Sequence, residues 1–202
     1  MIAIIDYGIG NLRSVQRALE LYHSNVVITN ERITIKEAQA LVLPGVGAFG
    51  DAVSELKDRG LFQVLKQQIR KKRTLAICLG MQLLFERSEE NPEAEGLGVL
   101  FGEVKKLTPS GLIRIPHTGW NRLYPINEPY FSGFAYFNHT FYCKPDFPGV
   151  ILAHTLHGRR IPAIIAKESI LATQFHPEKS KETGKRILHY WVNLVQSQES
   201  KV

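Results

Sequence analysis

The sequence predicts an α/β protein with a mostly parallel central sheet, helices on both faces and additional antiparallel hairpins. Over about the first 80 residues, short apolar segments alternate with helical patterns, which is the order of a right-handed β-α-β sheet. From about residue 95 to 166 the pattern changes to short strand signals separated by turn residues and prolines, which is typical of antiparallel hairpins.

Short apolar segments in the first half are the predicted parallel strands. They cover residues 2–5, 26–28, 40–43 and 74–77, and helical spacing of apolar residues lies between them at 12–22, 49–56 and 61–69. Asn11 is placed to cap the first of these helices. Because parallel sheets bind ligands at the carboxyl ends of their strands, we expect the site where Asp6, Pro44 and Cys78 follow their strands.

The second half is expected to form hairpins packed on the first sheet. The hairpin strand signals cover residues 99–101, 103–107, 120–123, 133–137, 140–142, 150–154 and 163–166, and a separate apolar strand is expected at 169–172. Ser180 is placed to cap a C-terminal helix, and residues 196–202 are expected to be a frayed tail. A chain of 202 residues, 44% of them hydrophobic, suits one sizeable core, so residues 1–202 are expected to form a single domain.

Charge and composition argue against nucleic-acid and membrane partners. The 25 Lys and Arg residues exceed the 19 Asp and Glu residues, but the cations are scattered and form no basic stripe between aromatic residues. No apolar run approaches a membrane span, and the opening residues do not resemble a signal peptide, because Asp6 follows at once. Cys78 and Cys143 supply no disulfide framework, and a free thiol fits the reducing cytoplasm, where we expect the protein.

Cys78 lies where the strand at 74–77 turns into a helix. The small residues Ala76 and Gly80 allow a tight turn, as in the nucleophile elbow of hydrolases. At a helix N-terminus the unpaired N–H groups favour the thiolate, which is the nucleophilic form. The N–H of Leu79 would then point at an oxyanion formed on the attacked carbonyl. The alternative is a core cysteine, since free cysteines are mostly buried.

A histidine and a carboxylate follow the strand at 169–172. Pro177 has a fixed φ and biases His176 toward extended geometry, so the side chains of His176 and Glu178 keep a fixed relation. A base that faces Cys78, oriented by a carboxylate, completes the arrangement needed for covalent catalysis. Taken separately, His176 and Glu178 would also suit a surface loop and the start of a helix, but beside a cysteine elbow they favour catalysis.

Residues 78–82 and 176–178 resemble the catalytic triad of the class I glutamine amidotransferases, which hydrolyse glutamine to glutamate and ammonia. Stretches at 6–11, 43–50 and 115–121 are similar to the glutaminase subunits of imidazole glycerol phosphate synthases, which act in histidine biosynthesis. The resemblance covers about residues 2–195. It implies a flavodoxin-like fold, L-glutamine as substrate, the catalytic residues Cys78, His176 and Glu178, and neither a cofactor nor a metal.

The glycine-rich segment 44–50 has more than one interpretation. A phosphate loop is disfavoured, because the glycines at 8 and 10 lack the third glycine of a dinucleotide fingerprint and no Gly-Lys-Ser/Thr follows any glycine. The resemblance implies an oxyanion strand, in which an N–H at Val46 or Gly47 turns toward the tetrahedral intermediate beside the N–H of Leu79. Gly47 and Gln82 are candidates for holding glutamine. A plain glycine-rich loop remains the alternative.

Nothing in the sequence predicts a use for the ammonia, since we find no ATP loop, sugar-phosphate site or second domain. We therefore expect a partner that takes the ammonia directly and activates the glutaminase when its own ligand is bound. The resemblance implies a (β/α)8 cyclase subunit in a heterodimer. The candidates for that contact, which would by default be core or sheet residues, are His117, Trp120, Tyr136, His139 and Lys179.

Some positions depart from the family pattern. Ala76 stands where glycine is more common, and this change is expected to affect the rate of catalysis and not the identity of the enzyme. Thr118 and Asn138 stand where apolar residues are common, so details of the partner interface are expected to differ from those of the family. A related glutaminase of pyridoxal phosphate synthesis would share the triad, but it usually has Gly-Gly-Glu-Ser where this chain has 44–47. A catalytically silent binding module is the alternative from another functional class, and the intact triad argues against it.

Overall fold

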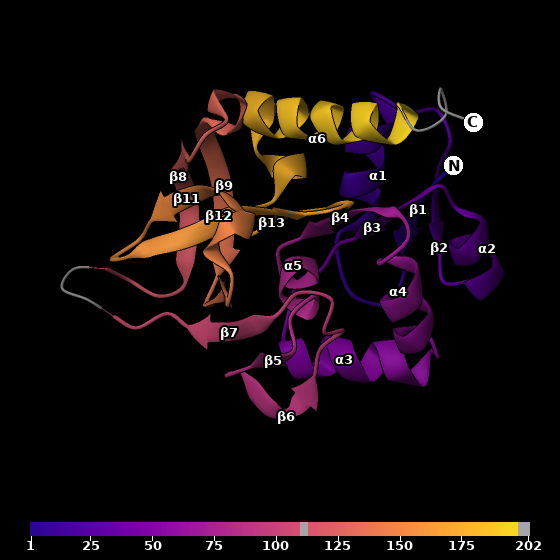
Figure 1. The fold of residues 1–202 in the computed structure, drawn as a ribbon, viewed down its shortest axis with the longest axis horizontal. Helices are drawn as coiled ribbons and strands as arrows, with labels where there is room; N and C mark the ends of the chain where they lie inside the picture. The colour runs from indigo at the N-terminus through magenta and orange to yellow at the C-terminus, as the bar shows by residue number, and fades with distance from the viewer. Residues whose placement is uncertain (110–112, 198–202) are drawn as a thin grey trace.

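A nine-stranded mixed sheet runs through the computed structural model, which describes residues 1–109 and 113–197 (Figure 1). Its strand order is β2-β1-β3-β4-β13-β12-β11-β8-β9. The first five strands in this order pair in parallel: β2 (Val26–Thr29), β1 (Ile2–Ile5), β3 (Ala40–Leu43), β4 (Arg73–Ile77) and β13 (Ile170–Thr173). The other four continue the same sheet in antiparallel pairing: β12 (Arg160–Lys167), β11 (Ile151–Leu156), β8 (His117–Pro125) and β9 (Gly133–His139).

Alternate residues of the parallel strands enter two different cores. Ile2 and Ile4 pack into the core formed with α1 (Leu12–Glu20) and α6 (Lys181–Gln196). Ala3 and Ile5 point to the opposite face. That face is covered by α2 (Arg32–Glu37), α3 (Phe49–Asp58), α4 (Phe62–Gln68) and α5 (Leu79–Leu83). In Figure 1, α1 and α6 lie on one side of the sheet, and α3, α4 and α5 lie on the other. The predicted fold class, with helices on both faces, is confirmed.

A second sheet packs beside the α3–α5 core. Its strand order is β10 (Phe141–Pro145), β7 (Gly102–Lys106), β5 (Arg87–Ser88) and β6 (Asn91–Glu95). Val104 and Cys143 from this sheet share a core with Phe85, so the sheet closes that side of the molecule. Short 3₁₀ turns complete the described elements at Pro129–Phe131, Pro148–Val150 and Pro177–Lys179.

The structure corrects the hairpin prediction in two respects. Most of the predicted hairpin strands extend the first sheet edge to edge, and they do not pack on its face. Residues 99–101 are not a strand, because the N–H groups of Val99 and Leu100 both donate to the carbonyl oxygen of Leu84, at 2.9 Å. Of the predicted tail, Gln196 still belongs to α6, and residues 198–202 lie outside the described residues.

Ser180 occupies the N-cap position of α6 but does not cap the helix. Its hydroxyl donates to the His176 carbonyl oxygen at 2.6 Å and accepts from the Tyr136 N–H at 2.9 Å. The side chain therefore ties the loop after β13 to strand β9. Asn11, in contrast, caps α1 as predicted, since its side chain accepts from the Ser14 N–H.

The turn between β4 and α5 brings two backbone segments into contact. Cys78 has φ 53° and ψ −108°, a left-handed conformation that side chains other than glycine rarely adopt. Gly80 lies against β3, and a methyl group added there would overlap the Leu43 carbonyl oxygen. Because backbone cannot move aside as a side chain can, this position requires glycine.

We expect Gly80→Ala to lower the free energy of unfolding by about 1–3 kcal/mol, because the added methyl group overpacks the β3–α5 contact. Urea denaturation measures the change. Gly50→Ala is the matched control, since a methyl group at Gly50 meets side-chain atoms of the exposed Asn91, which can turn aside, and no backbone carbonyl. Equal losses in the two variants would contradict this account of the turn.

Candidate active site

Cys78 is held at the carboxyl edge of the sheet by the pairing of two parallel strands. Its N–H donates to the Thr173 carbonyl oxygen of β13 at 2.7 Å, directly beyond the Thr173–Ile77 pair. The turn then carries the side chain off the end of β4, as the sequence predicts for an elbow. A left-handed residue of this kind costs about 1–3 kcal/mol, which the surrounding packing must offset.

His176 and Glu178 emerge beside Cys78 at the end of β13. His176 Nδ1 and Glu178 Oε1 are 3.0 Å apart, and their side chains are 4% and 2% exposed. The His176 N–H donates to the Tyr136 carbonyl oxygen at 3.0 Å, and its own carbonyl oxygen accepts from Ser180. The imidazole is therefore fixed at its backbone and at Nδ1, which leaves Nε2 for the hydrogen bond to Cys78.

The surroundings of His176 favour the imidazolium. Burial alone would lower its pKa, but hydrogen bonds to Cys78 and Glu178, together with their negative charges, raise the pKa from 6.5 to about 9. Near neutral pH this ring therefore carries the proton. A cysteine beside an imidazolium is the arrangement that activates a thiol nucleophile.

Two groups that the sequence did not predict as contacts of the nucleophile lie against the Cys78 sulfur. Gln174 Nε2 and the Asn138 carbonyl oxygen are each 3.9 Å from Sγ. The Gln174 side chain is fully buried, and its Oε1 has no hydrogen-bond partner among the residues that the structure describes. An amide donor can stabilise the thiolate and a carbonyl oxygen can accept from the thiol, so the sulfur has a partner in either state.

A cavity of about 200 Å³ opens at Cys78. All four residues predicted to bind the oxyanion or glutamine, Val46, Gly47, Leu79 and Gln82, line it with Cys78. The other lining residues are Glu90, Pro116, Asn138, His139, Thr140 and Phe141. The structure thus brings the predicted nucleophile and the predicted substrate contacts to one space.

The segment 44–47 is anchored at one end. The Tyr7 hydroxyl donates to the Pro44 carbonyl oxygen at 2.6 Å, and a methyl group on Gly45 would collide with that hydroxyl and with Leu79. Gly47, at the other end, has φ +94°, which few other residues adopt. The backbone at Val46 and Gly47 therefore lies in the cavity wall, and the glycine at 47 lets that backbone adopt conformations that other residues rarely reach.

Glu90 is a cavity residue that sequence reasoning missed. It lies in the turn between β5 and β6, and its Oε2 accepts from the Phe49 N–H at 2.7 Å. Among the described residues that line this cavity, it is the one carboxylate. No sequence motif marks it, because β5 and β6 are short and rich in charged residues that look like a loop.

The predicted interface residues fall into two groups. The side chains of His117 and His139 are buried, at 3% and 5% exposure, which argues against direct contact with a partner. Trp120 is 47% exposed, Lys179 is exposed and Tyr136 is half-buried. The Trp120 and Tyr136 rings meet edge to face at 6.1 Å, with the Lys179 ammonium 6.0 Å from the Tyr136 ring.

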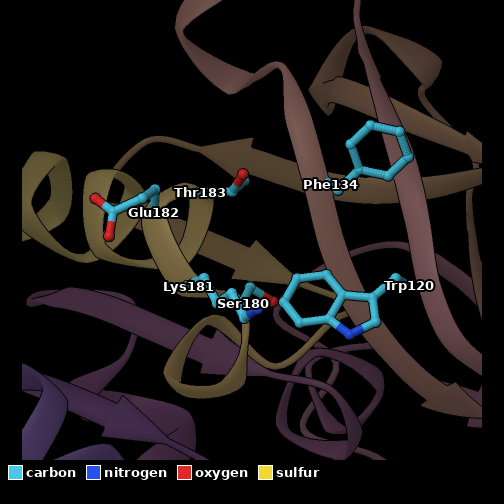
Figure 2. Close-up of a pocket in the computed structure, with 6 residues that line it drawn as sticks. All are labelled: Trp120, Phe134, Ser180, Lys181, Glu182 and Thr183. Carbon is cyan, nitrogen blue, oxygen red and sulfur yellow. The ribbon is translucent and has the colours of Figure 1, made fainter.

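A hollow of about 530 Å³ lies beside these exposed residues. Figure 2 shows Trp120 and Phe134, from β8 and β9, together with Ser180, Lys181 and Thr183 at the start of α6. The Lys181 ammonium lies 5.5 Å from the Trp120 ring. Among the described residues, no group of three or more His, Cys, Asp or Glu side chains is placed to hold a metal ion.

Known proteins resemble this chain along its whole length. Residues 3–193 match the family described as Glutamine amidotransferase class-I. The imidazole glycerol phosphate synthase subunit HisH 1 of Methanococcus maripaludis is 45% identical, over 96% of this chain and 100% of its own. The HisH subunit of Exiguobacterium sibiricum is also 45% identical, over 95% and 94%. The chain belongs to the class I glutamine amidotransferases, among the HisH subunits.

The fold agrees with this family. A crystal structure of a glutamine amidotransferase superposes with a TM-score of 0.78, covering 97% of this chain and 100% of that one at 20% identity. Membership among the HisH subunits favours the predicted histidine-pathway subfamily over the glutaminase of pyridoxal phosphate synthesis. The structure places Cys78 after β4 and the buried His176–Glu178 pair after the neighbouring strand β13, at the same edge of the sheet.

The raised pKa of His176 predicts a pH-dependent stability. The proton is held more tightly in the folded state, so its stabilisation is complete below about pH 6.5 and is lost as pH rises through about 9. Glu178→Gln removes the negative charge and should lower the pKa of His176 and flatten this decline. Titration of the imidazole by NMR and urea unfolding between pH 6 and 9.5 measure both effects.

Glu182→Gln is the control for that experiment, because Glu182 forms an exposed ion pair with Lys185 and is not one of the groups that shift the pKa of His176. An identical decline of stability in wild type and Glu178→Gln would show that the charge of Glu178 does not hold the proton on His176.

Gln174→Leu should slow alkylation of Cys78 by iodoacetamide about 3- to 10-fold at neutral pH, because the thiolate loses an amide donor. Mass spectrometry follows the label, with Cys78→Ala as the blank for the buried Cys143. Gln39→Leu is the matched control, since Gln39 also has an unpaired side-chain oxygen among the described residues but bonds to Val195 on α6. An unchanged alkylation rate in Gln174→Leu would show that the Gln174 amide does not stabilise the Cys78 thiolate.

Proposed function

We propose that this chain is the glutaminase subunit of an imidazole glycerol phosphate synthase, acting in the cytoplasm as a single domain over residues 1–202. It hydrolyses L-glutamine to glutamate and ammonia and delivers the ammonia to a (β/α)8 cyclase subunit in a heterodimer. The observation that carries the proposal is the buried His176–Glu178 pair beside the Cys78 cavity, in a chain 45% identical to HisH subunits. Among the described residues, no helix is long and apolar enough to cross a membrane.

The first half of the reaction forms a thioester. The Cys78 thiolate attacks the carboxamide carbon of glutamine, while the proton of the thiol rests on His176. The N–H of Leu79 and a turned N–H at Val46 or Gly47 stabilise the oxyanion, and one such donor is worth about 2.7–4 kcal/mol of barrier. His176 then donates its proton to the departing nitrogen, which leaves as ammonia. The raised pKa of His176 suits this role, because the proton is present when the C–N bond breaks.

The second half releases glutamate. Water gives a proton to the neutral His176 as it attacks the thioester carbon, and the tetrahedral intermediate collapses with loss of the Cys78 thiolate. Glu178 holds Nδ1 throughout, so Nε2 faces the sulfur in both halves. Each cycle therefore returns the enzyme to a thiolate beside an imidazolium.

The cavity suits an amino acid with a carboxamide side chain. Gln82 and Gly47 lie in its wall and are proposed to hold the glutamine. Glu90 supplies a carboxylate to this cavity, so we propose that it binds the α-ammonium group of the substrate. A volume of about 200 Å³ fits a small amino acid and not a nucleotide.

The exposed face of Trp120, Tyr136 and Lys179 is the proposed contact with the cyclase. Its residues are aromatic rings with lysines above them, beside the hollow shown in Figure 2. The same strand, β9, provides the carbonyl oxygen that fixes His176, so docking on this face acts close to the catalytic base. A peptide at 46–47 that turns only when the partner is bound would keep the isolated subunit slow.

We expect glutamate release from glutamine to be slow with this chain alone and strongly stimulated by a cyclase subunit and its ribonucleotide ligand. A coupled glutamate dehydrogenase assay measures the rate, and Cys78→Ala is the blank. Equal turnover with and without partner would mean a free glutaminase. No turnover under any condition would favour a catalytically silent binding module.

A further inference from the structure

A chain of hydrogen bonds joins strand β8 to the wall of the Cys78 cavity. Asn121 Nδ2 lies 3.0 Å from His117 Nε2, and His117 Nδ1 lies 2.9 Å from His139 Nε2. His139 Nδ1 in turn lies 2.8 Å from the Phe141 carbonyl oxygen. The two histidines are a directly opposed pair across β8 and β9, and both side chains are buried.

The direction of every bond in this chain follows from its last member. A carbonyl oxygen only accepts, so His139 carries its proton on Nδ1. A neutral His139 then accepts at Nε2, which requires a proton on His117 Nδ1. His117 Nε2 is left to accept from the Asn121 amide. Both rings are thus neutral and in the Nδ1–H form, the less common tautomer of a free imidazole.

The charge state agrees with this deduction. Burial, together with the neighbouring His139 and His157, lowers the pKa of His117 to about 3. Burial likewise lowers the pKa of His139 to about 4, although its bond to Phe141 acts in the opposite direction. A proton added to His139 Nε2 would face the His117 Nδ1–H donor at 2.9 Å, and one added to His117 Nε2 would face the Asn121 amide donor at 3.0 Å.

The last atom in this row of hydrogen bonds, the Phe141 carbonyl oxygen, is also bonded to Gln82, a residue predicted to contact glutamine. The Phe141 carbonyl oxygen accepts from Gln82 Nε2 at 3.1 Å as well as from His139. Gln82, His139 and Phe141 all line the Cys78 cavity. Because this carbonyl oxygen joins α5 to the start of β10, its position sets the distance between two walls of the cavity.

We propose that His117 and His139 are positioning residues that fix the glutamine-binding wall through the Phe141 carbonyl oxygen and Gln82. The inference rests on the proposed glutaminase activity and assigns these two residues to substrate affinity. This row of hydrogen bonds cannot carry protons to Cys78, because it ends on a carbonyl oxygen that has no proton to pass on. Its effect is therefore geometric, and it falls on KM for glutamine more than on kcat.

The test compares substitutions that keep or remove one hydrogen bond. His117→Phe keeps the ring that stacks on Phe137 and His157 but leaves His139 Nε2 without a donor. His117→Asn keeps a donor near the position of Nδ1. The matched control is His157→Phe. His157 stacks on His117 at 4.1 Å, but it is not part of the row of hydrogen bonds, because its ring donates to the Arg114 carbonyl oxygen.

With the partner-stimulated enzyme, we expect His117→Phe to raise KM for glutamine about tenfold, the effect of one lost buried hydrogen bond, with a smaller change in kcat. His117→Asn and His157→Phe should stay within about threefold of wild type. Nitrogen-15 NMR of the wild-type chain should show both histidines as neutral Nδ1–H tautomers at pH 7.

Two results would overturn the inference: a proton on Nε2 of either histidine, or an unchanged KM in a folded His117→Phe. The NMR measurement needs no turnover, so it decides the hydrogen-bond chain even if the wild type releases no glutamate. Absence of wild-type turnover would count against the proposed function, whereas normal wild-type turnover with no effect of His117→Phe would count against this inference alone.

Discussion

The site depends on one backbone contact, the close approach of Gly80 to the Leu43 carbonyl oxygen. Because α5 starts this near β3, the chain must turn sharply at Cys78 and place its side chain beyond the sheet edge. The parallel pairing of β4 with β13 then brings the loop that carries His176 to the same edge. A bulkier residue at position 80 would move the helix, and the sulfur would move with it.

The antiparallel half of the sheet supplies the surroundings that make this edge reactive. Strand β9 fixes the His176 N–H through Tyr136 and places the Asn138 carbonyl oxygen near the sulfur. Its partner β8 holds His117 against His139 in the cavity wall. The parallel half therefore positions the nucleophile, and the antiparallel extension buries the base and shapes the substrate space.

Local patterns account for what the sequence predicted. Strands such as Ile2–Ile5 and Ala40–Leu43 are continuous apolar segments, and the triad positions lie in two short motifs at strand ends. Helix α2 was missed because Ile33, Thr34 and Ile35 are β-branched, and only packing of Ile35 in the core favours a helix there. Glu90, Gln174 and the His117–His139 pair depend on contacts between distant segments, which no local pattern encodes.

Several locally unfavourable features gather at the same place. Cys78 has a left-handed backbone, and among the described residues Glu178 Oε2 and Gln174 Oε1 are buried without hydrogen-bond partners. Such features are rare in folded proteins, where buried polar atoms are normally hydrogen-bonded, and each of them lies at or beside the proposed triad. Burial of the His176–Glu178 pair also costs desolvation energy that a hydrophobic pair would not. Stability is lowered where an oriented nucleophile and base are required, and the two apolar cores on either side of the sheet supply the free energy that offsets it.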